Sequence, residues 1–201
     1  MSDSPSATVI LPEAEPAQSL AEPDLLEVVR LGHPTLREVA EAVPEDLFGS
    51  ARLQRLARAL IRTMFEESGV GLAAPQVAEP LRLFAYWVPG TEDEPEIAPS
   101  VVVNPEIRAV GDHLEEGWEG CLSIPHLRGL VPRHSRIKVR GRSVDGEPIS
   151  LTADGFHARV LQHENDHLDG IVFLDRMTSM ASLAFEDEWE RYDLGREQDD
   201  D

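Results

Sequence analysis

The sequence predicts an α+β fold in which several short strands and two well-defined helices form one domain. One helix is indicated after Ser50, where apolar residues recur every one or three positions up to Phe65. A second helix opens at Asp154-Gly155 and carries two histidines four residues apart. Short apolar or alternating segments, separated by Gly and Pro, are typical of strands. Short strands together with separate helices favour an α+β arrangement.

The composition is that of an ordinary globular protein. The chain has 201 residues, with 41% hydrophobic and 28% charged residues, which suits one domain with tails. No apolar run approaches the roughly 20 residues that span a bilayer. No Lys or Arg precedes Arg30, as a secretory or transit peptide would require. The only cysteine, Cys121, excludes a disulfide within the chain, and we expect a cytoplasmic protein.

The net charge of −20 is concentrated at the two ends of the chain. Residues 1–24 contain five acids and no Lys or Arg, and residues 186–201 contain nine acids against two Arg. Acidic ends repel a phosphate backbone, so we expect no direct nucleic-acid binding. We also expect no membrane association, because the sequence has no apolar run long enough to span a bilayer. We interpret both ends as solvated tails.

The first half of the chain contains the clearest helix. Residues 1–24 are rich in Pro, Ala, Ser and Glu and predict a disordered extension, dispensable for turnover. Residues 26–31 form a short strand or an extended segment, and Thr35 caps a helical turn that ends near Val43-Pro44. Ser50 is the predicted N-cap of the long helix, which ends before Gly69. Its apolar positions are Leu53, Leu56, Ala57, Leu60, Ile61, Met64 and Phe65.

The remaining segments predict strands and a C-terminal helix. Residues 81–88 and 101–103 form strands, with an exposed acidic loop over 91–99. Residues 136–142 alternate in polarity and pair with 148–153 across a turn at Asp145-Gly146. Residues 179–192 are expected to form a helix with Leu183, Phe185 and Trp189 as its apolar residues.

The segment Gln162-His163-Glu164-Asn165-Asp166-His167 contains the pattern His-Glu-x-x-His. Residues four apart lie one turn from each other on a helix, so His163 and His167 can reach one metal ion. Glu164 can then act as the general base toward an attacking water.

A catalytic metal of this kind usually has three protein ligands, so one more is needed. Two candidates stand in the sequence. Glu186 lies 19 residues beyond His167, as in a thermolysin-like peptidase, and Cys121 lies upstream in Glu119-Gly120-Cys121-Leu122-Ser123. From these residues alone, both remain open.

Three motifs, taken together, resemble the peptide deformylase family. That family shows Gly-x-Gly-x-Ala-Ala-x-Gln, Glu-Gly-Cys-Leu-Ser and Gln-His-Glu-x-Asp-His in this order. The chain has them at residues 69–76, 119–123 and 162–167 without a substituted position. The resemblance implies a catalytic domain over residues 25–180, followed by a C-terminal helix and acidic tail over 181–201. It also implies antiparallel or mixed sheets that partly enclose the histidine helix.

The resemblance assigns a role to each site residue. Cys121, His163 and His167 would hold one divalent metal ion, Fe(II) in most of the family, with Zn(II), Ni(II) or Co(II) as substitutes. Glu164 would be the general base, and the Gln76 amide and the Leu122 backbone N–H would stabilise the developing oxyanion. The reaction would remove the formyl group from the N-terminal formyl-methionine of nascent peptides, at the ribosome exit, and release formate.

The resemblance also implies a substrate site. An apolar pocket would take the methionine side chain, backbone groups would pair with the extended peptide, and an Arg would lie at the pocket mouth. Asp166 is expected to make a structural bond, to an Arg such as Arg133 or Arg159. The substrate-site residues, by position, are Val70, Phe156 and Val160 for methionine, Gly71 and Gly120 for the backbone, and Arg128 at the mouth.

One feature departs from the family, and two other functions stay open. Some bacterial deformylases dock on the ribosome through a basic C-terminal helix, whereas this chain ends in acids. A thermolysin-like peptidase using Glu186 would leave Cys121 idle. A non-catalytic member that binds formylated peptides would have no need of Glu164 as a base.

Overall fold

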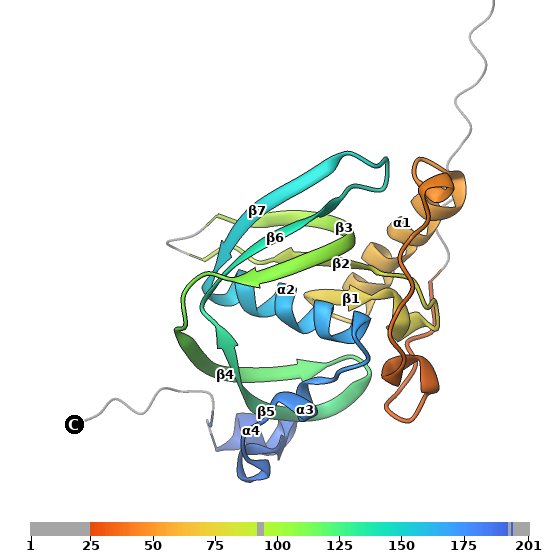
Figure 1. Cartoon of the computed structure of the whole chain (residues 1–201). Coiled ribbons are helices and arrows are strands. Elements are labelled where there is room, and N and C mark those ends of the chain that lie inside the picture. Colours follow the sequence, from red (N-terminus) through yellow and green to blue (C-terminus); the bar gives the residue numbers. More distant parts are fainter. Residues whose placement is uncertain (1–24, 92–94, 193, 195–201) are drawn as a thin grey trace, which may run out of the picture.

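The computed structural model describes residues 25–91, 95–192 and 194, and folds them as two antiparallel sheets around one central helix (Figure 1). This confirms the expected α+β fold. The predicted disordered extension over residues 1–24 and the acidic tail beyond 194 lie outside the described residues. No helix within the described ranges is both long and apolar enough to cross a membrane.

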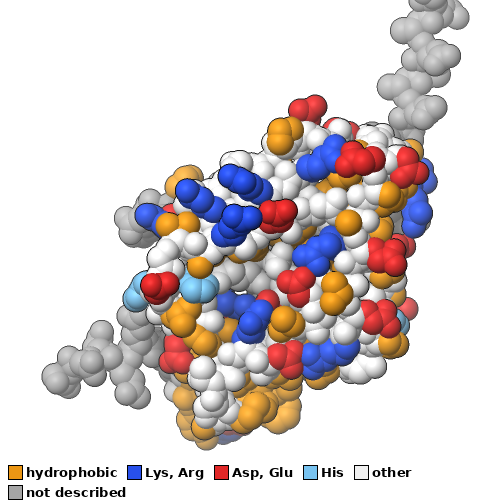
Figure 2. All heavy atoms as spheres, in the orientation of Figure 1, with side chains coloured by type: hydrophobic (Ala, Val, Ile, Leu, Met, Phe, Trp, Pro, Cys, Tyr) orange, Lys and Arg blue, Asp and Glu red, His pale blue; other side chains and the backbone are white. Residues whose placement is uncertain are grey.

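The larger sheet has five strands in the order β1-β2-β3-β6-β7. Its β6 strand alternates between buried Ile137 and Val139 and exposed Arg136, Lys138 and Arg140, as a sheet with one solvated face requires. Basic side chains accordingly gather over β6 and its neighbours in Figure 2. The strands are β1 (Gly71–Ala73), β2 (Leu83–Val88), β3 (Ile97–Ala109), β6 (Arg136–Arg142) and β7 (Pro148–Asp154).

The smaller sheet has the order β4-β5-β8, with strands β4 (Leu114–Cys121), β5 (Ile124–His134) and β8 (Ala184–Phe185). The strands β4 and β5 form a hairpin that ends at Cys121. The chain then passes from β5 into β6 across Ser135 alone, so the two sheets are joined at this corner. The sequence analysis did not predict this hairpin.

Helix α2 (Gly155–Leu168) lies between the two sheets, with the five-stranded sheet on one side and the β4–β5 hairpin on the other (Figure 1). Helix α1 (Ala51–Glu66) packs beside β1 and β2. Its predicted cap is confirmed, because the Ser50 hydroxyl accepts a hydrogen bond from the Leu53 N–H over 3.2 Å. Both predicted helices are therefore present, and α2 occupies the centre of the molecule.

The N-terminal segment is extended but is not part of a sheet. The Val29 N–H donates to the Gln76 carbonyl over 2.8 Å, and the Leu31 N–H donates to the Ser123 carbonyl over 2.8 Å. The turn that follows differs from the prediction. His33, not Thr35, is the cap of this turn, and Pro34 is its first residue. The turn is a single 3-10 turn that ends at Arg37, because the backbone of Glu38 is already extended.

The C-terminal segment also differs from the single predicted helix over residues 179–192. It contains a 3-10 turn, the short strand β8 and the helix α4 (Glu186–Arg191). Pairing of Phe185 with Leu127 and of Ala184 with Arg128 draws the chain into the smaller sheet, so tertiary pairing overrides the helical pattern. The remaining short helices are η1 (Pro34–Arg37), η2 (Glu45–Leu47), η3 (Ala74–Val77), α3 (Phe173–Arg176) and η4 (Met180–Ser182).

Candidate active site

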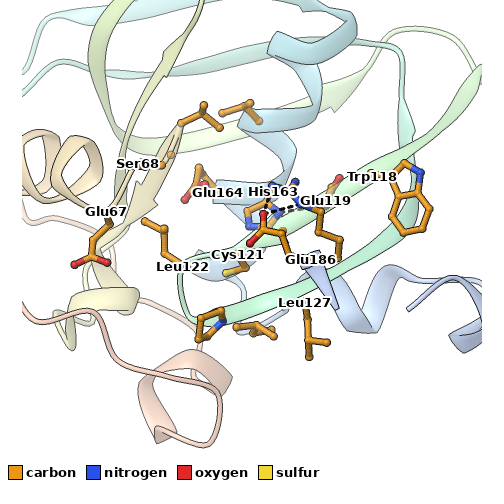
Figure 3. A pocket seen from close by; sticks show the side chains of 18 of the residues that line it. Glu67, Ser68, Trp118, Glu119, Cys121, Leu122, Leu127, His163, Glu164 and Glu186 are labelled. Atoms are coloured by element: carbon orange, nitrogen blue, oxygen red, sulfur yellow. Dashed lines mark hydrogen bonds and ion pairs between the residues drawn. The ribbon is translucent and has the colours of Figure 1, made fainter. Parts of the chain in front are cut away.

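Helix α2 and the β4–β5 hairpin bring together one thiol and two imidazoles. Cys121, His163 and His167 each offer a ligand atom, and these atoms all lie within 4.8 Å of one another. The Cys121 Sγ is 3.3 Å from His167 Nε2. Figure 3 shows His163 on α2 facing Cys121 on the hairpin. The upstream candidate for a third ligand, Cys121, is thus the one that joins the two histidines.

Local structure explains why these groups converge. His163 and His167 are one turn apart on the same face of α2, and both are buried. The β4–β5 register shifts between Gly120 and Cys121, which forms a bulge at the end of the ladder. A bulge re-aims the side chain that follows it, and here that side chain is the thiol.

A buried carboxylate lies directly behind His163. Glu119 Oε2 is 2.9 Å from His163 Nδ1, which leaves Nε2 as the ring nitrogen free to face the thiol. Burial opposes the ionisation of Glu119, but hydrogen bonds from His163 and Arg133 outweigh it and hold the carboxyl pKa well below its usual range. Arg159 donates to the same carboxylate over 3.0 Å. Glu119 is therefore a charged, fixed support for the His163 ring.

Arg133 joins this carboxylate to a second one on α2. Its guanidinium donates to Glu119 over 2.9 and 3.0 Å and to Asp166 over 2.5 Å, and all three side chains are buried. Arg176 completes the network by donating to both oxygens of Asp166. The expected structural bond of Asp166 is present with Arg133, whereas Arg159 bonds to Glu119 instead. This network ties α2 to the hairpin that carries Cys121.

Glu164 is a buried carboxylic acid beside the same cluster. Burial raises its pKa to about 7; the charge of His163 lowers the pKa by a smaller amount, and the negative charge of Glu119 raises it. Its Oε2 has no hydrogen-bond partner among the described residues. The backbone of Gly71 approaches it so closely that a Cβ there would lie 2.1 Å from Glu164 Oε1. A carboxyl group with a pKa near neutrality is suited to proton transfer.

His167, whose Nε2 lies 3.3 Å from the thiol, is held in its neutral form. Burial, followed by the charges of His163 and Arg133, lowers the pKa of His167 well below its usual value. A neutral imidazole is the form that binds a metal. The donor set and its spacing therefore fit one divalent metal ion.

A hydrogen bond from a neighbouring backbone N–H orients the side-chain amide of Gln76 toward the thiol. Its Oε1 accepts from the Ala73 N–H over 2.8 Å, which turns Nε2 toward Ser123 Oγ at 3.3 Å and Cys121 Sγ at 3.5 Å. Leu122 follows Cys121 in the hairpin turn and lines the same cavity (Figure 3). Both predicted oxyanion donors therefore lie next to the cluster.

One cavity of about 520 Å³ is lined by six of these residues, namely Gln76, Glu119, Cys121, Leu122, His163 and Glu164. The predicted substrate residues also line it, namely Val70, Gly71, Gly120, Arg128, Phe156 and Val160. Glu186 lies at the same cavity but is paired with Arg128 rather than with the histidines, so it is outside the thiol–imidazole cluster. A cavity of this size, with a few convergent polar groups, has the character of a small-ligand site.

Three contacts of the site have no counterpart in the sequence analysis. The bonds of Glu119 to His163, of Ser123 to Gln76 and of Glu186 to Arg128 depend on the hairpin and the β8 pairing, which were not predicted. The only signal for Glu119 was its place in the Glu-Gly-Cys-Leu-Ser motif, two residues before the thiol.

The fold and the site together define a class. A thiol on the hairpin, together with two imidazoles and a buried carboxylic acid on the central helix, are the features of a mononuclear metal-dependent hydrolase. A sequence model of the polypeptide deformylase family matches residues 25–182. The chain belongs to this family.

Individual members of the family are similar to this chain over most of their length. Peptide deformylase 2 of Pseudomonas syringae pv. tomato is 40% identical over 163 residues, which are 80% of this chain and 91% of that protein. Peptide deformylase 2 of Nostoc sp. is 42% identical over 171 residues, which are 84% of this chain and 94% of the Nostoc protein. The structure is similar to that of a class I type b peptide deformylase from Acinetobacter baumannii, with a TM-score of 0.73 and 39% sequence identity. The match covers 77% of this chain and 99% of the Acinetobacter chain.

Proposed function

We propose that the protein removes the formyl group from the N-terminal formyl-methionine of newly synthesised polypeptides and releases formate. The observation that carries this proposal is that the buried carboxylic acid Glu164 lines one cavity together with Cys121 and His163, two of the three predicted metal ligands. The metal-dependent hydrolase class and the family membership support the same reaction.

Cys121 Sγ and one ring nitrogen of each histidine would hold the metal ion. For His163 this atom is Nε2, because Nδ1 lies against Glu119. When bound, the metal would acidify a water and polarise the formyl oxygen. A thiolate with two imidazoles suits Fe(II), which is our proposed metal, and also Zn(II), Ni(II) or Co(II).

Glu164 would transfer the protons of the reaction. It would accept a proton from the attacking water and then deliver this proton to the nitrogen of the departing amine. One carboxyl group would thus act first as the base and then as the acid. Gln76 Nε2 and the Leu122 backbone N–H would donate to the formyl oxygen, on which negative charge develops when water attacks the formyl carbon. The orientation of the Gln76 side chain supports this role, since Gln76 Oε1 accepts a hydrogen bond from the Ala73 N–H and Nε2 is turned toward Cys121.

The cavity would bind the start of an extended peptide. Val70, Phe156 and Val160 would contact the methionine side chain, and the backbone at Gly71 and Gly120 would pair with the peptide. Arg128 would lie at the mouth. The Acinetobacter relative was solved with Met-Ala-Ser bound, which supports a peptide that extends beyond methionine. We place the reaction in the cytoplasm, on nascent chains at the ribosome exit.

The catalytic domain would comprise residues 25–180, with 1–24 as an extension outside it and 181–201 as a C-terminal helix and tail. The match to the family model begins at residue 25, which supports a start of the domain there. A protein that lacks residues 1–24 should keep its turnover of formyl-methionyl peptides. A large fall in kcat/KM on truncation would contradict this boundary.

Metal analysis of two variants tests the ligand set. Cys121→Ala should lose its bound metal, because it removes one of three ligands, whereas Glu186→Ala should retain it. A thermolysin-like peptidase would show the reverse. The non-catalytic alternative is tested by formate release, since a formyl-peptide-binding protein would bind without turnover.

A further inference from the structure

The pocket-lining Arg128 is held by a carboxylate from the far end of the chain. Arg128 Nε donates to Glu186 Oε1 over 2.9 Å, and Nη2 donates to the same oxygen. Both side chains are about one-third exposed, at the rim of the cavity. Figure 3 shows Glu186 pointing from the C-terminal segment into the pocket. Two donors on one acceptor fix the plane of the guanidinium.

An aromatic ring from the same segment covers the guanidinium. The Arg128 Cζ lies 4.8 Å from the centroid of the Trp189 ring, and Trp189 packs edge-on against Trp118 with centroids 6.1 Å apart. The pairing of Ala184 with Arg128 brings this segment to β5. Glu186 and Trp189, on α4, are therefore placed beside Arg128 by the strand that interrupts the predicted C-terminal helix.

The remaining nitrogen of Arg128 lies over the strand that faces the substrate. Gly120 is the register partner of Arg128, and a Cβ on Gly120 would lie 3.7 Å from Arg128 Nη1. Within the described residues Nη1 donates no hydrogen bond, unlike Nε and Nη2. Gly120 immediately precedes Cys121, so a peptide paired with Gly120 would pass beneath Nη1.

We propose that Glu186 is a positioning residue that holds Arg128, against Trp189, with Nη1 directed at the peptide backbone beyond the methionine. This inference rests on the proposed function and concerns the same site. The C-terminal segment would thereby build the part of the substrate site that contacts the second and third residues of the formyl peptide. A carbonyl oxygen of the peptide is the chemical group that an oriented guanidinium N–H binds.

Steady-state kinetics on a long and a short substrate test this role. We would compare formyl-Met-Ala-Ser with formyl-Met-amide, using Ni(II)-loaded protein. Glu186→Ala should raise KM for the long substrate about five- to tenfold, with kcat within twofold, because Arg128 must then be ordered during binding. KM for formyl-Met-amide should not change. Arg128→Lys should give the same pattern, because an ammonium cannot keep the fork geometry, and the double variant should be no worse than either single one.

A matched control and a second readout exclude a structural role. Glu190→Ala changes an exposed carboxylate on the same helix and should leave both substrates unaffected. Calorimetric binding of Met-Ala-Ser should weaken by the same factor in Glu186→Ala, and this measurement needs no turnover. An equal loss for long and short substrates, or no loss in either assay, would overturn the positioning role. Wild-type protein that binds Met-Ala-Ser but releases no formate would instead overturn the proposed function.

Discussion

His163 Nδ1 lies 2.9 Å from Glu119 Oε2, and this carboxylate is itself held by Arg133 and Arg159. The ring is thus fixed from behind by an anion that is buried and ionised. A carboxylate in this position sets the ring orientation and raises the basicity of the opposite nitrogen. The site is therefore supported by contacts that lie one layer behind the predicted metal ligands.

Replacing Glu119 with Gln should weaken metal binding while leaving the ligands in place. The amide keeps the shape of the side chain but removes the charge that supports His163, so we expect a loss in metal affinity of about 10- to 100-fold. Competition with a chelator measures this affinity. Glu116→Gln, at an exposed position on the same strand, is the control and should not change it. Equal affinities for the two variants would contradict the support role of Glu119.

Replacing Arg133 with Leu should destabilise the fold strongly. Arg133 bridges Glu119 and Asp166 with about 5% of its side chain exposed, so its removal leaves two buried carboxylates without this partner. The free energy of unfolding should fall by about 3–5 kcal/mol in urea denaturation. Arg136→Leu breaks an exposed, solvent-screened pair with Asp154 and should change the free energy of unfolding far less than Arg133→Leu does. Similar losses for both variants would show that the buried network adds no stability.

The stability of the metal-free protein should depend on the protonation of Glu164. Burial raises the pKa of Glu164 in the folded state to about 7, above the ordinary glutamate value of about 4.5, so the folded state binds the proton more tightly than the unfolded state. Stability should therefore decrease as pH rises from about 4.5 to 7, by about 3 kcal/mol from this group. Denaturation of wild type and Glu164→Gln across this range measures the difference. A difference that does not vary with pH would refute the raised pKa.

Replacing Gly71 with Ala should displace the general base. The added Cβ would lie 2.1 Å from Glu164 Oε1 and 2.5 Å from its Cδ, so the carboxyl group must move. A displacement of about 1 Å at a catalytic group costs on the order of 100-fold in kcat. Metal content should stay unchanged, because Gly71 contacts none of the three proposed ligands. Full turnover in this variant would show that Glu164 tolerates the shift.

The sequence predicted the central parts of the fold and site because they depend on local patterns. The cap at Ser50, the spacing of His163 and His167, and the motif around Cys121 are each encoded within a few residues. The strands of the β4–β5 hairpin were missed because Gly117, Gly120, Gly129 and Pro132 interrupt their alternation.

The contacts that could not be predicted are those between distant segments. The single C-terminal helix was wrong because β8 pairs with β5, more than 50 residues upstream, and that pairing has no local signal. The Glu119–His163 and Arg128–Glu186 bonds likewise join residues separated by 44 and 58 positions. Such pairs become visible only when the sheets are placed around α2.

Formate release from formyl-Met-Ala-Ser tests the central claim most directly. The protein would be purified without oxygen, loaded with Fe(II) or Ni(II), and compared with Glu164→Ala at equal metal content. We predict turnover in the wild type and a loss of about 10²-fold or more in the variant, because the base is removed while the metal ligands remain. A fully metal-loaded wild type that releases no formate, or a Glu164→Ala variant that turns over at the wild-type rate, would contradict the account.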